Sequence, residues 1–418
     1  MAKWKSQQLS NLASITMGSS PKSTAYNDEG IGLPLIQGNA DIKNRLTKPR
    51  TYTSQITKEC TPGSIIMTVR APVGAIAKST VKGCIGRGVC AISATKISQD
   101  YLYQYLISQE SKWKKLEQGS TFSAIGSKDV KQLSIAYPES VKEQAQIAEV
   151  LSTVDKKIDL IDQKIAETEK LKTGLMQKLF SEGVGVQDEN GNWQPHTEFQ
   201  DSPFGKIPQP WSTLELAEIA DIEDGDRGKS YPKQADFSDF GYCLFLSAKN
   251  VTKQGFTYET TQFISQEKHN KLRKGQVLQN DIVLTTRGTV GNFGLFKHEE
   301  LFDAVRINSG MAIIRCIDSS MPNYLYQFMQ SPQFKAQISK VVFGSAQPQL
   351  TIKQIKKFKV LVPISEEKKW IEETLKLAND KLTLLEQQKA ETQQLKKGLM
   401  QKLLTGEWRV PVEETEAA

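Results

Sequence analysis

Two arginines stand in the same short setting at two places in this chain. Thr68-Val69-Arg70 is followed by Val73-Gly74, and Thr286-Arg287 is followed by Val290-Gly291. In both places a strand-forming run ends near the arginine and a glycine turn follows, which predicts a side chain at a loop tip. A guanidinium in that position suits contacts with phosphates and with base edges. The alternative is an exposed charge on an ordinary turn.

Small polar loops accompany both arginines. One pair of loops is Gly-rich and carries Lys-Ser, and a second pair is Gly-Ser-Thr in one place and Gly-Ser-Ala-Gln in the other. Lysine, serine, threonine and glutamine at loop tips are donors for phosphate and base contacts. We therefore predict nucleic-acid contacts from Lys22, Ser23, Arg70, Ser120 and Thr121, and from Lys229, Ser230, Arg287, Ser345 and Gln347.

Catalytic chemistry has no comparable signal. The three histidines, His196, His269 and His298, have no cysteine or carboxylate at metal-ligand spacing. Gly228-Lys229-Ser230 resembles the end of a phosphate-binding P-loop, but the leading glycine is replaced by Glu223. The sequence predicts neither an active site nor a metal site.

Composition bounds the class of protein. The chain has 418 residues, 38% of them hydrophobic, with a net charge of +7, so we expect two or three globular domains. No run approaches the length of apolar residues that spans a membrane, and no secretory leader is evident. Five cysteines without a CxxC pair predict reduced thiols and a cytoplasmic location, with no membrane partner.

The chain contains a long internal sequence repeat that occurs twice. Glu167–Leu179 reads ETEKLKTGLMQKL and Glu391–Leu403 reads ETQQLKKGLMQKL, with ten of thirteen positions identical. Earlier in each copy, Trp4, Leu9 and Gly18 match Trp211, Leu216 and Gly225 in the same order. A repeat this long is too large for a solenoid, whose repeats have about 20–50 residues. The sequence therefore predicts two paralogous bodies, each ending in a similar helix.

Each body is expected to be α+β. Short strand-like runs are broken by Gly, Pro, Asn and Asp, and Tyr101–Lys115 and Tyr324–Lys340 have the pattern of helices packed on a sheet. The expected strands are Ser64–Val69, Val89–Ser93, Leu133–Tyr137, Asp281–Thr285, Met311–Arg315 and Phe358–Val362.

After each body the apolar residues alternate at spacings of four and three, which is typical of a coiled-coil seam. A helix of about 38 residues is about 57 Å long and exceeds what one body covers, so we expect the two helices to pair antiparallel, related by a pseudo-twofold axis. We expect the seam to continue through Leu171, Leu175 and Leu179. Close approach by the mate or by a partner protein would explain the matched glycines, and simple tolerance of glycine in the helix is the alternative. The interface set is Ile147, Leu151, Val154, Ile158, Ile161, Gly174, Leu175, Ile371, Leu375, Leu382, Leu385, Gly398 and Leu399.

These patterns divide the chain into six segments. The segments are a first body at 1–142, a helix at 143–180, a polar linker at 181–205, a second body at 206–366, a helix at 367–405 and a tail at 406–418.

The arrangement resembles the DNA-specificity (S) subunit of type I restriction–modification enzymes. The resemblance covers the whole chain and includes Trp4 and Pro210-Trp211 opening the bodies, the arginine turns, the GS loops, and LKxGLMQKL closing each helix before Leu404-Thr405-Gly406-Glu407. The chain departs from the family where no proline precedes Trp4 and no glycine separates Pro210 from Trp211, which blurs where each body begins.

The resemblance implies a non-catalytic subunit in which each body is a target recognition domain for one half of an asymmetric, bipartite DNA target. The paired helices would set the distance between the half-sites and dock two methyltransferase (M) subunits, and two restriction (R) subunits would complete the complex. The N6-adenine methyltransferase and ATP-dependent endonuclease activities, with S-adenosylmethionine, ATP and Mg²⁺, would belong to those partners. No cofactor is expected on this chain.

Two other functions are compatible with the residues alone. A helical scaffold or adaptor would use both bodies to bind proteins, and it would show no DNA binding in the presence of its partners. A self-contained DNA methyltransferase or nuclease would need a cofactor or metal signature, and the sequence offers none.

Overall fold

The structure is a computed structural model that describes residues 3–119, 124–297, 301–342 and 348–411. Burial of side chains is described for the same residues except 114–119. The chain forms two compact units. The first unit comprises residues 1–163 and 386–418, and the second comprises residues 164–385. Each unit therefore contains one body, the adjoining part of one long helix and a part of the other long helix.

The first unit is built on two larger sheets and one strand pair. Buried β-branched residues favour these strands, and the central strand, with Ile65 and Ile66, is fully buried. One sheet has the order β2 (Ala13–Met17), β12 (Val89–Ala94), β9 (Ile65–Thr68), β10 (Ile76–Lys78), β6 (Leu46–Thr47), β5 (Ile42–Lys43). The other has the order β3 (Tyr26–Asn27), β7 (Thr51–Thr53), β4 (Leu33–Ile36), β11 (Gly83–Ile85), β8 (Glu59–Cys60), and β1 (Trp4–Gln8) pairs with β13 (Ser134–Pro138).

The second unit repeats this topology. Its main sheet has the order β19 (Ala220–Asp224), β27 (Met311–Cys316), β24 (Ile282–Thr285), β25 (Phe293–Leu295), matching β2-β12-β9-β10. Beside it lie β23 (Phe263–Ile264), β20 (Cys243–Leu246) and β26 (Ala304–Ile307), the pair β18 (Ser212–Glu215) and β28 (Lys359–Val362), and the pair β21 (Val251–Thr252) and β22 (Gly255–Phe256). The predicted duplication of an α+β body is confirmed, and each expected strand forms within two residues of its expected bounds.

One predicted helix is wrong in its continuity. In the first unit α1 is a single helix, Gln99–Gly119, but the expected helix 324–340 is two, α6 (Pro322–Met329) and α7 (Pro332–Val342). Pro332 has no N–H for a helical bond, and it disfavours helical geometry at the residue before it. The break turns α7 so that Phe334 packs edge-on against Phe328 of α6 at a ring separation of 5.9 Å.

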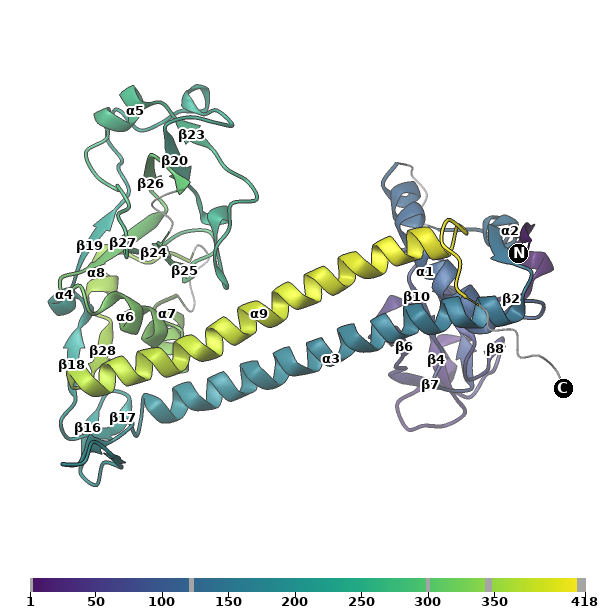
Figure 1. Cartoon of the computed structure of the whole chain (residues 1–418), viewed down its shortest axis with the longest axis horizontal. Helices are drawn as coiled ribbons and strands as arrows, with labels where there is room; N and C mark the ends of the chain where they lie inside the picture. Colours follow the sequence, from purple (N-terminus) through teal and green to yellow (C-terminus); the bar gives the residue numbers. More distant parts are fainter. Residues whose placement is uncertain (1–2, 120–123, 298–300, 343–347, 412–418) are drawn as a thin grey trace. The chain divides into compact units, whose positions relative to one another are not determined.

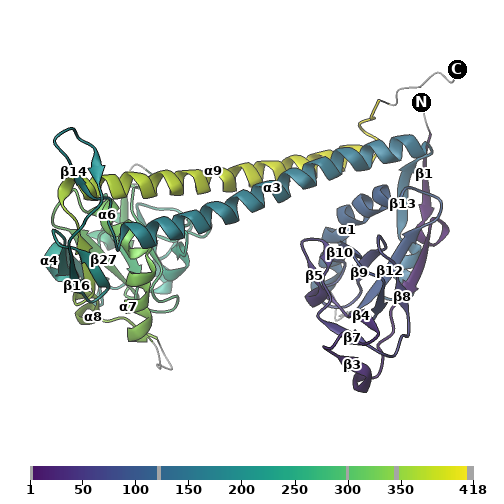
Figure 2. The same ribbon diagram turned by 90° about the horizontal axis from the view of Figure 1, so that it is seen from below.

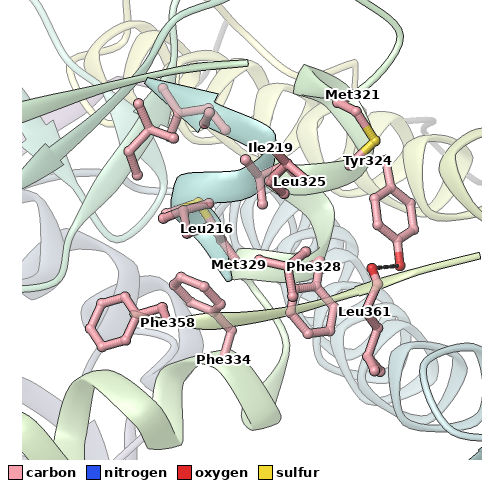
Figure 3. Close-up of a cluster of buried hydrophobic side chains, with 14 of the residues drawn as sticks. Leu216, Ile219, Met321, Tyr324, Leu325, Phe328, Met329, Phe334, Phe358 and Leu361 are labelled. Carbon is pink, nitrogen blue, oxygen red and sulfur yellow. Dashed lines mark hydrogen bonds between the residues drawn. The ribbon is translucent and has the colours of Figure 1, made fainter. Parts of the chain in front are cut away.

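The core of the second unit lies where α6, α7 and the strand pair meet. Figure 3 shows Leu216, Ile219 and Leu325 together with Phe328, Met329 and Phe334. The hydroxyl of buried Tyr324 donates to the Leu361 carbonyl of β28 at 2.8 Å, the bond drawn in the figure. In the first unit the hydroxyl of Tyr101 donates equivalently to Ala136 of β13 at 2.8 Å. The remaining short helices are α2 (Ser127–Gln132), α4 (Leu216–Ile219), α5 (Gln266–Lys271) and α8 (Ile352–Lys356).

The two long helices, α3 (Val141–Leu179) and α9 (Ser365–Leu403), have 39 residues each. In the first unit Lys389 forms an ion pair with Asp162 and Lys396 with Asp155, both at 2.6 Å. From the first pair to the second, the position on α9 rises by seven residues while the position on α3 falls by seven, so the helices are antiparallel. Figures 1 and 2 show the start of α3 (teal) beside the end of α9 (yellow) in this unit.

In the second unit the end of α3 packs with the start of α9. Met176 and Leu179 of α3 share one buried cluster with Ile371 and Leu375 of α9. The predicted packing of the two helices is confirmed in both units. The apolar members of the predicted interface set are all buried (Ile147, Leu151, Ile161, Ile371, Leu375, Leu385) or half-buried (Val154, Ile158, Leu175, Leu382, Leu399).

Each long helix begins at a buried carboxylate with a different set of partners. Glu367 of α9 is fully buried and accepts bonds from the Val184 and Gly185 amides, the His196 imidazole and the Trp211 indole. Glu143 of α3, the equivalent position, instead receives two bonds from Arg409 at 2.6 and 2.7 Å. Thus the segment after α3 packs onto the start of α9, and the segment after α9 packs onto the start of α3.

The expected polar linker is more structured than the sequence indicated. It forms two small hairpins, β14 (Val186–Gln187) with β15 (Trp193–Gln194), and β16 (Phe199–Ser202) with β17 (Gly205–Pro208). Their backbone groups bond across each pair, and the second pair delivers buried Ile207 to the core of the second unit.

Candidate nucleic-acid interface

The arginine turn of the first unit, residues 69–74, is fixed by Thr68 at the end of β9. The Thr68 hydroxyl donates to the Pro72 carbonyl at 2.6 Å and accepts from the Ala75 amide at 2.9 Å. Gly74, at φ +82°, donates its amide to the Thr68 carbonyl at 2.8 Å. This closed turn leaves Arg70 exposed next to the strand end, as the sequence predicted.

The arginine turn of the second unit, residues 286–291, is fixed in the same way. The Thr285 hydroxyl donates to the Thr289 carbonyl at 2.5 Å and accepts from the Asn292 amide at 3.0 Å. Gly291, at φ +90°, donates to the Thr285 carbonyl at 3.0 Å. Arg287 is exposed, so the two bodies present an arginine on one common backbone design.

The segment after each small polar loop meets the neighbouring arginine. Arg70 forms an antiparallel bridge with Ala124, and Arg287 forms one with Gln349. The four residues predicted on the polar loops themselves, Ser120, Thr121, Ser345 and Gln347, lie outside the described residues.

The Lys-Ser pairs occupy one corresponding loop, which we call the first loop, residues 18–23 and 225–230. It follows β2 in the first unit and β19 in the second. Lys22, Ser23 and Lys229 are exposed and Ser230 is half-buried. The structure therefore places all four at matching positions and open to a ligand, and their contact with nucleic acid stays a prediction.

A third segment, the return loop, joins the first loop to the arginine turn. It comprises residues 86–88 between β11 and β12, and residues 308–310 between β26 and β27. A Cβ on Gly18 would lie 2.1 Å from the Gly86 carbonyl oxygen, so only glycine permits this contact. On its other side the Gly88 carbonyl accepts the Val69 amide at 2.9 Å. The first loop and the arginine turn thus meet at one short segment.

Two arginines at this meeting point were missed by the sequence comparison. Arg87 lies on the return loop of the first unit, and Arg227 lies on the first loop of the second unit. Both are exposed. Because they do not occupy equivalent positions, aligning the two bodies could not pair them, and the only signal was a basic residue between glycines in each loop.

A buried carboxylate organises the loop that carries Arg227. Asp226 accepts the Gly228 amide at 2.6 Å and the Arg273 amide at 2.7 Å. Burial by itself raises the pKa of Asp226, but these amides and the Arg273 charge together hold the pKa below its ordinary value of 3.8. Asp226 therefore stays ionised and fixes the backbone between Arg227 and Lys229.

Within the part of the chain that the structure describes, no group of three or more histidines, cysteines, aspartates and glutamates is placed to hold a metal ion. Across the same residues, no helix is both long enough and apolar enough to cross a membrane.

The matched glycines of the long helices are exposed. A Cβ on Gly174 or on Gly398 would meet nothing within 4 Å apart from its chain neighbours and the nearby backbone of its own helix, so the mate helix does not approach either position. Approach by a partner protein stays a prediction. The expected seam through Leu171 is also wrong, because Leu171 is 60% exposed, and so is its equivalent Leu395, at 55%.

Comparison with known proteins is consistent with this geometry. The chain matches the family described as type I restriction modification DNA specificity domain twice, over residues 1–170 and 208–394. It is 30% identical to the type I restriction enzyme MjaVIII specificity subunit of Methanocaldococcus jannaschii over 75% of this chain and 72% of that protein, and 24% identical to the MjaIX specificity subunit over 97% and 94%. The crystal structure of a type I restriction–modification S subunit from M. genitalium has a similar fold, with a TM-score of 0.57 at 18% identity over 96% of both chains.

Proposed function

Because this chain belongs to the type I restriction–modification DNA specificity family, we propose that it recognises an asymmetric, bipartite DNA target, with each body reading one half-site through its arginine turn. The observation that carries this proposal is the repetition of one backbone design, Thr68 with Arg70 and Thr285 with Arg287, in two bodies whose surrounding loops differ. A common backbone turn surrounded by different loops is suited to reading two unlike DNA sequences.

The side chains on these loops fit DNA. Arginine donates two parallel bonds to guanine in the major groove, and lysine and serine serve phosphate oxygens. Of the ion pairs within the described residues, none involves Arg70 or Arg287, so a DNA ligand would not have to displace a carboxylate from either. The net charge of +7 favours association with a polyanion.

The long helices would dock the partners of this subunit. Leu171 of α3 and its equivalent Leu395 of α9 are both exposed by more than half. Each lies three residues before a matched glycine, Gly174 or Gly398. Two copies of one exposed apolar position suit two identical methyltransferase subunits.

The catalytic chemistry would then lie elsewhere. Methylation of adenine N6 and ATP-dependent cleavage belong to the methyltransferase and restriction partners in this proposal, together with S-adenosylmethionine, ATP and Mg²⁺. This chain would supply recognition and assembly only, in the cytoplasm.

The test of recognition uses the complex of this chain with its methyltransferase subunits. Arg70→Ala and Arg287→Ala should each weaken DNA binding through one half-site only, by about 1–3 kcal/mol for a bidentate base contact. Lys82→Ala is the control, an exposed cation that pairs with Glu59. Binding unchanged in both turn variants would refute the assignment, and a complex that assembles without any affinity for DNA would favour the adaptor function.

The test of assembly replaces these exposed leucines. Leu171→Asp should remove one methyltransferase subunit from the complex, and adding Leu395→Asp should remove the second, as measured by native mass spectrometry. Ala390→Asp is the control, because Ala390 is exposed on α9 but lies about 140° around the helix from Leu395. Full occupancy in the double variant would contradict this docking surface.

A further inference from the structure

The return loops of the two units can be aligned residue by residue. Three backbone bonds occur at the same steps of both loops, so Gly86 matches Asn308, Arg87 matches Ser309 and Gly88 matches Gly310. The bonds are Gly86 N to Ile36 O (2.8 Å) and Asn308 N to Leu246 O (3.0 Å), Val69 N to Gly88 O (2.9 Å) and Thr286 N to Gly310 O (2.8 Å), and Gly18 N to Val89 O (3.0 Å) and Gly225 N to Met311 O (3.4 Å).

The first loops of the two units also align residue by residue. A Cβ on Gly225 would lie 2.1 Å from the Asn308 carbonyl oxygen, the same clash that Gly18 avoids with Gly86. Two residues after these glycines stand Ser20 in the first unit and Arg227 in the second.

Serine and arginine are therefore exchanged between the two loops. The first unit has Ser20 on its first loop and Arg87 on its return loop, whereas the second has Arg227 on its first loop and Ser309 on its return loop. Each pair is in contact, because the Arg87 amide donates to the Ser20 hydroxyl at 3.2 Å and the Arg227 guanidinium donates to the Ser309 carbonyl at 3.3 Å.

Arg87 is adjacent in sequence to Gly88, which holds the arginine turn of the first unit, and Arg227 bonds to Ser309, the residue before Gly310, which holds the turn of the second unit. Gly88 bonds to the residue before Arg70, and the Gly310 carbonyl accepts the amides of Thr286 and Arg287. Arg87 takes part in no ion pair of the described residues, and Arg227 pairs only with half-buried Asp224, at 3.5 Å.

We propose that each body carries a second DNA-contacting arginine beside its arginine turn, Arg87 in the first body and Arg227 in the second, supplied by opposite loops. This inference rests on the proposed DNA recognition and adds to it a second contact within each half-site. Two arginines at one turn can engage neighbouring positions of one half-site, and because the first loop and the return loop are in contact, either loop can carry the second arginine. An exposed arginine that serves only solubility would not be expected to change loops and keep its serine partner.

The first experiment measures binding of the subunit–methyltransferase complex to duplexes in which one or the other half-site is scrambled. Arg87→Ala should lose roughly tenfold or more in affinity, all of it through the first half-site, and Arg227→Ala should lose as much through the second. Lys82→Ala and Lys359→Ala are the controls, since Lys82 pairs with Glu59 and Lys359 pairs with Glu215, all outside these loops. Unchanged affinity, or a loss spread over both half-sites, would overturn the inference.

The second experiment exchanges the pair. Arg227→Ser should lose affinity at the second half-site, and adding Ser309→Arg, which reproduces the layout of the first unit, should restore most of it. The same restoration is expected when Arg87→Ser is combined with Ser20→Arg. Because a misfolded variant would not be rescued by a second substitution at a half-buried loop position, restoration separates DNA contact from a structural role. A double variant as weak as the single one would contradict the exchange.

These outcomes can be told apart from failure of the proposed function itself. If the wild-type complex shows no preference for any split target, DNA recognition by this chain is refuted. If the wild type is selective, Arg70→Ala is impaired and Arg87→Ala is not, recognition stands and only the second arginine is excluded.

Discussion

The contact between Arg409 and Glu143 allows a sharp prediction about how the first unit is held together. Glu143 is only 1% exposed and receives two charge-assisted bonds from Arg409, at 2.6 and 2.7 Å. Arg409 comes from the segment after α9, whereas Glu143 lies in the first turn of α3. Removing the guanidinium leaves a carboxylate buried without its counter-charge.

The magnitude follows from that burial. Breaking a buried ion pair by removing one partner costs about 3–5 kcal/mol. The Arg409 side chain is 34% exposed, so water can reach part of the vacated space, and we expect Arg409→Ala to destabilise the first unit by about 2–3 kcal/mol. Adding Glu143→Gln should recover part of this loss, because a neutral amide has a smaller desolvation penalty than a carboxylate.

The assay is hydrogen exchange on the intact chain, because two units need not unfold together and a single melting temperature would mix them. Protection should fall in 141–151 and in the paired strands β1 and β13, and not in the second unit. Lys82→Ala, which breaks an exposed pair with Glu59, is the control and should change stability by less than about 1 kcal/mol. Equal effects of Arg409→Ala and Lys82→Ala would refute the reasoning.

Two further outcomes test the network at the start of α9 and the first loop. Trp211→Phe removes one of four donors to buried Glu367 and should destabilise the second unit by about 1–2 kcal/mol. Trp4→Phe should destabilise the first unit by less, because within the described residues the Trp4 indole N–H has no hydrogen-bond partner. Differential hydrogen exchange that ranks the two variants the other way would contradict this. Because the pKa of Asp226 lies below 3.8, its stabilising contribution is present above that value and is lost as pH falls through the folded pKa. The protection factors of loop 225–230, which are corrected for the intrinsic exchange rate, should therefore fall in acid in the wild type. Asp226→Asn should show lower protection factors already at neutral pH and little further change.

Much of the fold could be read from the sequence because its signals are periodic. The duplicated strands contain alternating or continuous apolar runs that end at glycine, so they were placed within two residues. The long helices show a four-three seam without proline, and their antiparallel pairing follows from two such seams in one chain. The arginine turns could be found in the sequence because Thr68 and Thr285 occupy matching positions before the arginines. In the structure the two threonines also make matching hydrogen bonds.

The misses occurred where polar residues perform a structural role. Lys172, next to exposed Leu171, is half-buried, and its ammonium donates to Gln330 at the end of α6 at 2.6 Å. Burial and the nearby Lys335 charge lower the pKa of Lys172, so a titratable residue occupies a place that the apolar pattern assigned to leucine. The linker hairpins have few buried apolar residues, and hence no alternation to detect.

The second arginines were missed for another reason. A comparison of two repeats finds residues at equivalent sequence positions. Arg87 and Arg227 are not at equivalent positions, although both lie where the first loop and the return loop are in contact. Backbone hydrogen bonds were needed to show that Arg87 corresponds to Ser309, and Ser20 to Arg227.

The central claim is that the two bodies read the two parts of one split DNA target. Methylation-sensitive long-read sequencing of DNA from cells with this chain and its methyltransferase partner tests it most directly, with wild type compared to Arg287→Ala. The account predicts a motif of two unlike parts separated by unspecified base pairs, and in the variant a relaxed preference in one part alone. A continuous motif, or a motif that changes in both parts when Arg287 is replaced, would contradict it.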